Sequence, residues 1–163
     1  MSAFPDLRRL VGTTVADKYR VEEMVGEGGF GVVFRARHLI WDQPVALKCF
    51  TAFTDQPEHL RDPLLEHFVQ EGALMGALSS HTAAIVQARD IGTLTTPDGA
   101  WLPYMVLEWL SGASLDAFLR DPADHPRGRR YSALEAFQLL DGPARALAMA
   151  HDHNIAHRDI KPA

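Results

Sequence analysis

A group of closely spaced glycines is the first feature of this sequence that could do chemistry. Residues 26–31 have the pattern G-x-G-x-x-G and lie between two strand-like runs. Glycine lets a backbone turn tightly and approach a phosphate with no side chain in the way. A dinucleotide-binding loop would need a helix directly after the glycines, whereas Val32 and Val33 continue as a strand. The pattern favours a strand–loop–strand cover for a phosphate, and a plain glycine-rich hairpin turn is the alternative.

A lysine stands on a strand that is otherwise apolar. Lys48 ends the run Val45-Ala46-Leu47-Lys48. Strand side chains alternate between two faces, so Ala46, Lys48 and Phe50 share one face. Such a lysine is either held for a purpose or snorkels at a sheet edge.

A glutamate interrupts the apolar stripe of a helix predicted over residues 60–79. Glu71 lies in the middle of the stripe formed by Leu64, Phe68, Met75 and Leu78. A carboxylate on a buried helix face is costly unless a cation meets it. We therefore expect an ion pair between Glu71 and Lys48, the nearest inward-facing cation. The alternative places Glu71 at the wet margin of the stripe.

A polar loop near residue 160 is the last feature of the sequence that could do chemistry. In His157-Arg158-Asp159-Ile160-Lys161-Pro162 an acid is flanked by two cations. Phosphoryl transfer needs such a base with charge stabilisers around it. A basic surface loop is the alternative.

The elements that position these groups follow from the residue patterns. Strand-like runs occupy residues 19–25, 32–38, 44–50, 84–92 and 102–107. Helices are predicted over 60–79, 114–120 and 132–153, and the last opens with the capping box Ser132-Ala-Leu-Glu135. Five strands around one helix, followed only by helices, predict a small sheet-plus-helix part ending near Leu107 and a helical part after it. The crevice between two such lobes is a natural ligand site.

The bulk composition limits the classes of function. The 163 residues are 47% hydrophobic and 23% charged, which suits one globular domain. A net charge of −5 argues against a nucleic-acid or membrane-surface partner. The single cysteine, Cys49, excludes a disulfide scaffold, and with no signal peptide or membrane span in the sequence we expect a cytoplasmic protein.

Taken together, these motifs resemble a eukaryotic-type Ser/Thr protein kinase of the sort also common in bacteria. The likeness runs in order from about Tyr19 to Pro162, and residues 105–110 look like the hinge, with Leu107 in the gatekeeper position. The resemblance implies an α+β fold with a five-stranded antiparallel N-lobe sheet, one helix of the αC type, a hinge and the first helices of a C-lobe. It places a lead-in at 1–18 and the kinase domain at 19–163, with the N-lobe at 19–107 and the hinge and C-lobe start at 108–163.

The resemblance also implies ATP as cofactor and a protein Ser/Thr hydroxyl as acceptor. Lys48 would hold the α/β-phosphates and be kept in place by Glu71. Asp159 would accept the proton of the hydroxyl, and Lys161 would steady the γ-phosphate. The residues implied to contact ATP are Val25, Gly26, Glu27, Gly28, Gly29, Phe30, Gly31, Val32, Val33, Ala46, Lys48, Glu108 and Leu110.

The sequence ends at Ala163, where the family continues to the Mg²⁺-binding asparagine and the DFG aspartate. We therefore expect the 163-residue chain by itself to lack a complete Mg²⁺ site and useful kinase activity. A non-catalytic ATP-binding or scaffold module is the alternative function. The apolar face of the helix over 132–153 predicts self-association. A zinc site around His151, His153 and His157 is a weaker alternative, because no cysteine or carboxylate cluster completes it.

Overall fold

A computed structural model describes residues 6–29, 31–54, 57–120, 131–157 and 160–161, with the backbone alone described at Glu58, His67 and Glu71. The chain divides into two units. The first consists of Met1–Ser80 and Val86–Trp109, and the second of His81–Ile85 and Leu110–Ala163. No helix in the described part of the chain is long and apolar enough to cross a membrane.

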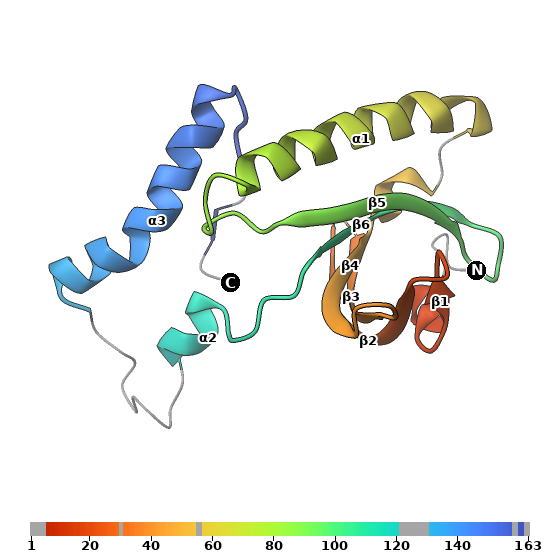
Figure 1. The fold of residues 1–163 in the computed structure, drawn as a ribbon, viewed down its shortest axis with the longest axis horizontal. Coiled ribbons are helices and arrows are strands. Elements are labelled where there is room, and N and C mark those ends of the chain that lie inside the picture. Colours follow the sequence, from red (N-terminus) through yellow and green to blue (C-terminus); the bar gives the residue numbers. More distant parts are fainter. Residues whose placement is uncertain (1–5, 30, 55–56, 121–130, 158–159, 162–163) are drawn as a thin grey trace. The chain divides into compact units, whose positions relative to one another are not determined.

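The first unit is built on a six-stranded sheet in which every neighbouring pair is antiparallel (Figure 1). Its strands are β1 (Thr14–Val15), β2 (Tyr19–Gly28), β3 (Gly31–His38), β4 (Gln43–Cys49), β5 (Ala88–Thr95) and β6 (Trp101–Glu108). The spatial order is β1-β2-β3-β4-β6-β5. The antiparallel sheet confirms the predicted class of fold, with six strands in place of five. The additional strand, β1, is two residues long, too short for an alternating pattern to reveal it.

Three α-helices and two short 3₁₀ helices complete the described structure. The α-helices are α1 (Glu58–Ser79), α2 (Leu115–Arg120) and α3 (Ala133–Asp152), and the 3₁₀ helices are η1 (Leu7–Leu10) and η2 (Thr51–Phe53). The predicted capping box is present at the start of α3. The Glu135 N–H donates to Ser132 Oγ at 3.3 Å, and the Ser132 N–H donates to Glu135 Oε2 at 2.9 Å.

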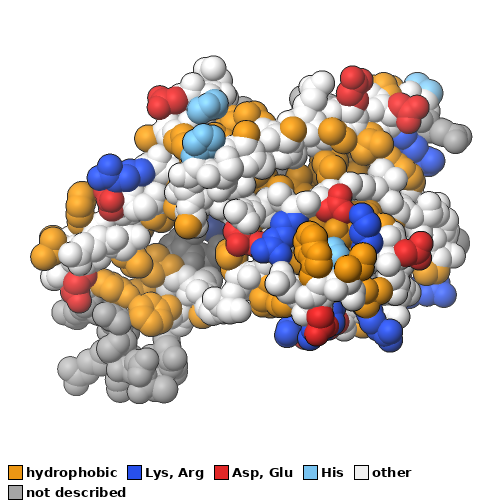
Figure 2. All heavy atoms as spheres, in the orientation of Figure 1, with side chains coloured by type: hydrophobic (Ala, Val, Ile, Leu, Met, Phe, Trp, Pro, Cys, Tyr) orange, Lys and Arg blue, Asp and Glu red, His pale blue; other side chains and the backbone are white. Residues whose placement is uncertain are grey.

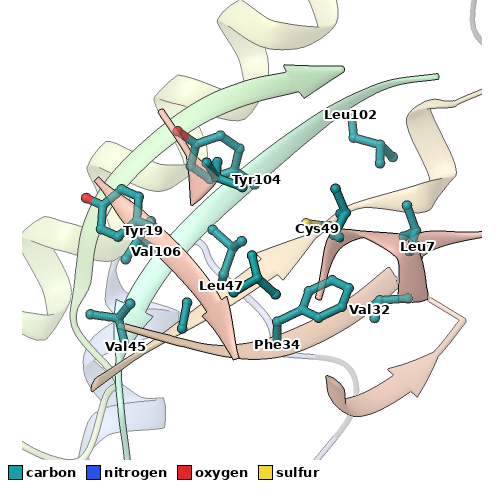
Figure 3. Close-up of a cluster of buried hydrophobic side chains, with 14 residues drawn as sticks. Leu7, Tyr19, Val32, Phe34, Val45, Leu47, Cys49, Leu102, Tyr104 and Val106 are labelled. Carbon is teal, nitrogen blue, oxygen red and sulfur yellow. The ribbon is translucent and has the colours of Figure 1, made fainter. Parts of the chain in front are cut away.

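The main hydrophobic core lies on one face of the sheet (Figure 3). On β4, the buried residues Val45, Leu47 and Cys49 alternate with the half-buried Ala46 and Lys48. The residues expected to be a lead-in contribute to the same core, because Leu7, Leu10 and Val15 are buried in it. This segment therefore packs as part of the first unit.

Helix α1 packs against the opposite face of the sheet. Gly72 allows the close approach, since a Cβ atom there would lie 3.1 Å from Ile91 Cδ1 and 3.3 Å from Met105 Cε. Phe68 and Leu78 are buried, which confirms the predicted apolar stripe at these two positions. The Phe68 ring contacts the Phe50 ring edge-to-face, with centroids 4.8 Å apart.

Candidate active site

The glycine motif forms the tip of a β-hairpin. β2 and β3 pair up to Gly28 and Gly31, and Gly26 pairs with Val33. This geometry confirms the predicted strand–loop–strand arrangement and excludes the strand–helix turn of a dinucleotide-binding fold. Phe30 lies outside the described residues.

The glycines of this hairpin serve two different needs. Gly31 has φ +141°, and a Cβ atom there would overlap the carbonyl oxygen of Cys49. Gly31 is therefore required by the fold itself. At Gly28 and Gly29 an added Cβ atom would meet no described atom within 4 Å. Packing does not require glycine at these two positions, so a ligand phosphate can approach the backbone there.

A continuous sheet face lies beside the hairpin. Lys48 pairs with Val33 on β3 and with Met105 on β6, and Ala46 pairs with Leu107. Directly opposite residues in an antiparallel sheet share one face. We call the face formed by Val33, Ala46, Lys48, Met105 and Leu107 the site face. It lies opposite the main core.

One expected contact residue is turned away from the site face. The side chain of Val32 is 5% exposed and belongs to the main core. This side chain points away from the site face, because neighbouring strand residues point to opposite faces and Val33 occupies the site face, so a contact of Val32 with ATP would have to come from its backbone and stays a prediction. Val25 and Glu27 are exposed on β2.

Lys48 lies on an interior strand, since β4 is flanked by β3 and β6. The alternative of a lysine at a sheet edge is therefore excluded. Its Nζ lies 5.0 Å from the centroid of the Phe50 ring, and burial lowers the pKa of the ammonium group. The expected partner Glu71 lies in α1, but its side chain is outside the described part of the structure. The Lys48–Glu71 ion pair remains a prediction.

The predicted hinge begins where β6 ends. The Glu108 N–H donates to the carbonyl oxygen of Gln87 at 2.9 Å, and the Gln87 N–H donates to Glu108 Oε1 at 2.8 Å. The Glu108 carboxylate thus ties the start of the hinge to the segment before β5. The Arg35 guanidinium lies 5.4 Å from the Trp109 ring centroid and 3.3 Å from Glu22 Oε2. The sequence did not predict the Glu108–Gln87 bonds or the Arg35–Trp109 contact, because in each case the two residues are far apart in the chain.

The second unit contains the other predicted catalytic residues. α3 ends at Asp152, and the chain continues through His157, which is exposed. Lys161 and Leu110 are also exposed, while Arg158, Asp159 and Pro162 fall outside the described residues. Among the side chains that the structure describes, no group of three His, Cys, Asp or Glu residues could hold a metal ion.

A lobe with a glycine hairpin, a half-buried lysine on the neighbouring strand and a helix packed behind it defines a kinase-type class of protein. The family model "Protein kinase domain" matches residues 19–163. The chain therefore belongs to the protein kinase family.

Several bacterial relatives are similar over most of the chain. Serine/threonine-protein kinase PknB of Mycolicibacterium smegmatis is 34% identical over 149 residues, which are 91% of this chain and 22% of that protein. Serine/threonine-protein kinase pkn3 of Myxococcus xanthus is 32% identical over 160 residues, which are 97% of this chain and 26% of that protein. PknB of Mycobacterium tuberculosis is 34% identical over 91% of this chain and 22% of its own length. The chain thus spans 22% to 26% of the length of these relatives, each of which is named as a serine/threonine-protein kinase.

Proposed function

We propose that this chain provides the ATP-binding part of a kinase that transfers the γ-phosphoryl group of ATP to a Ser or Thr hydroxyl of a protein. The observation that carries the proposal is the position of Lys48, paired with Val33 beside an open glycine hairpin on the site face. The names of the bacterial relatives support the Ser/Thr acceptor class.

ATP fits the residues of the first unit. The backbone at Gly28 and Gly29 has room for phosphate oxygens, which backbone N–H groups bind well. Val33 and Ala46 offer an apolar surface to the adenine. The backbone groups of Glu108, the last residue of β6, and of Leu110, which belongs to the second unit, would bind the adenine edge. A Mg²⁺ ion bound with ATP would neutralise charge on the phosphates.

Each charged residue then has one role in the transfer. Lys48 donates hydrogen bonds to the α/β-phosphates, and Glu71 holds the Lys48 ammonium in place. Asp159 accepts the proton of the attacking Ser or Thr hydroxyl. The oxygen of that hydroxyl bonds to the γ-phosphorus at the same time. The bond from the γ-phosphorus to the bridging oxygen breaks, and ADP leaves. Lys161 offsets the negative charge on the transferred group.

An ATP titration of two matched lysine variants tests the binding role. Lys48→Met removes a charged donor, so the Kd for ATP should rise about tenfold or more. Lys18→Met is the control, because Lys18 precedes β2 at the end opposite the glycine hairpin and is half exposed. Isothermal titration calorimetry of the 163-residue chain gives both constants. Equal ATP affinity in Lys48→Met and the parent chain would overturn the proposal.

A non-catalytic ATP-binding module is the second candidate function. It is favoured by the fact that the first unit alone contains the glycine hairpin, Lys48 and the start of the hinge. Incubation of the chain with Mg²⁺, radiolabelled ATP and a Ser/Thr peptide tests the module. Label transfer that disappears in Asp159→Asn would exclude the module and contradict the expected inactivity of the 163-residue chain, whereas ATP binding with no transfer is the result expected for both candidates.

Self-association is a further proposal, supported by the surface of α3. Leu134 and Phe137 are each 66% exposed and Leu140 is 51% exposed, and hydrophobic side chains are visible among polar ones on this part of the surface in Figure 2. Light scattering should give a mass above that of a monomer. Phe137→Ser should reduce this measured mass. A monomer at all concentrations would contradict it.

The cytoplasm remains the proposed location, on the grounds of acidic charge and one cysteine.

A further inference from the structure

The ring of Phe50 lies against the ammonium group of Lys48. Phe50 follows β4 directly, two residues after Lys48 and therefore on the same face of the strand. Lys48 Nζ is 5.0 Å from the ring centroid, within the roughly 6 Å over which a cation is attracted to an aromatic face. The Phe50 N–H donates to the carbonyl oxygen of Pro103 at 3.0 Å, which fixes the backbone beneath the ring.

The same ring is held from the side of α1. Phe68 is 4% exposed, and its ring meets Phe50 at 74° with centroids 4.8 Å apart. Phe53 contacts Phe68 at 6.0 Å. Phe68 lies one helical turn before Glu71, so the aromatic contact joins the strand of Lys48 to the helix of Glu71.

A ring in this place does more than fill space. Burial removes part of the hydration of the Lys48 ammonium, and the negative face of an aromatic ring replaces part of that stabilisation. The ring also restricts a side chain with four rotatable bonds. A lysine held in one position loses less conformational entropy when it binds a phosphate. A leucine at position 50 would fill a similar volume without attracting the cation.

We propose that Phe50 is a positioning residue for Lys48, whose ring holds the ammonium group where it meets the phosphates of ATP. The Phe68 ring in turn holds Phe50. This proposal rests on the proposed ATP-binding role of Lys48. It assigns to an aromatic side chain a part of the phosphate affinity, and none of the adenosine affinity.

Two ligands and three variants test the proposal in the 163-residue chain. Phe50→Leu should weaken ATP about fivefold and leave the affinity for adenosine unchanged, because adenosine has no phosphate. Phe53→Leu is the control, since the Phe53 ring contacts Phe68, whereas among the described residues it is the Phe50 ring that meets the Lys48 ammonium. Phe50→Trp, which keeps an aromatic face, should restore ATP binding. Equal loss for ATP and adenosine, or no loss in Phe50→Leu, would overturn the proposal.

A second measurement needs no ATP binding. The rate at which an amine-acylating reagent modifies Lys48 is followed against pH by peptide mass spectrometry. The ring favours the charged amine, so Phe50→Leu should shift the midpoint of this profile to lower pH, while Phe53→Leu should not. Glu71 is retained in every variant. An unchanged midpoint would overturn the role of Phe50 even if the parent chain failed to bind ATP, a failure that would by itself overturn only the proposed function.

A shape-matched substitution covers the case in which Phe50→Leu does not fold. Pentafluorophenylalanine at position 50 keeps a ring of similar shape and reverses its quadrupole. The same loss of ATP affinity and the same shift of the Lys48 profile are expected. If both quantities match the parent chain, the ring acts by packing alone and the proposal is wrong.

Discussion

The hydroxyl of Tyr19 donates a 2.7 Å hydrogen bond to Oδ2 of Asp90, and so joins β2 to β5. These strands are not neighbours, because β3, β4 and β6 lie between them in the sheet. The bond is possible only because the sheet curls until two distant strands approach each other. Tyr19 is 3% exposed, and burial, followed by the bond to Asp90, raises the pKa of its hydroxyl. The curled sheet encloses the main core on one of its faces. Lys48 lies on the other face.

Removing the Tyr19 hydroxyl should destabilise the first unit. Tyr19→Phe leaves the ring in the core and deletes one hydrogen bond to a charged acceptor, at a cost of about 1.5–3 kcal/mol in the free energy of unfolding. Urea denaturation measures the loss. A double-mutant cycle with Asp90→Ala, which removes the acceptor, is the control, and it should show that the two substitutions are not additive. Additive effects would mean that the bond contributes nothing.

Substitution by alanine should affect different properties at two glycines of the hairpin, stability at Gly31 and ATP binding at Gly28. Gly31→Ala forces a side chain into the carbonyl of Cys49 at a positive φ, so it should cost about 2 kcal/mol or more of stability. Gly28→Ala has room for its methyl group and should change stability little, while it weakens ATP binding. Thermal unfolding and ATP titration of both variants check this. A Gly31→Ala chain as stable as the parent would contradict the packing argument.

Cys49 should make the protein less stable in alkali. Burial raises the pKa of its thiol from 9.0 to about 12. Above pH 9 the unfolded chain releases this proton and the folded chain keeps it, so stability falls as pH rises towards 12. The slope for this one group is about 1.4 kcal/mol per pH unit.

The alkaline slope is isolated by comparing the parent chain with Cys49→Ala in urea denaturation at pH 8 to 10.5. Burial also raises the pKa values of Tyr19 and Tyr104, but both tyrosines are present in each chain. The difference in slope between the two chains therefore reports Cys49 together with its electrostatic effect on Tyr104. Parallel pH profiles would refute the assignment.

Glu108 should act through its side chain on stability and through its backbone on ATP. Glu108→Ala deletes the acceptor of the Gln87 N–H and should cost about 0.5–1.5 kcal/mol. Glu108→Gln keeps an acceptor oxygen and should remain close to the parent chain in both stability and ATP affinity. Thermal melts with and without ATP measure both. A large loss of ATP affinity in Glu108→Gln would show that the carboxylate itself binds the ligand.

Local residue patterns determined much of the architecture and part of the site. The alternation from Val45 to Phe50 separates the core side of β4 from the Lys48 side, because strand geometry depends only on neighbouring residues. The stripe around Phe68 and the capping box at Ser132 follow equally from spacings of three and four residues. The glycines between two strand-like runs predicted the hairpin for the same reason.

Only the tertiary structure decided which surfaces meet. β1 is too short to have a pattern, and it exists because Val15 is buried in a core built by distant strands. Val32 and Val33 are identical in type, and the pairing with β4 decides which of them faces the site. The interior place of Lys48 and its contact with Phe50 depend on β6 pairing with β4 and on α1 placing Phe68 beside Phe50. These pairings bring together residues that are far apart in the chain. Patterns among residues a few positions apart therefore cannot predict them.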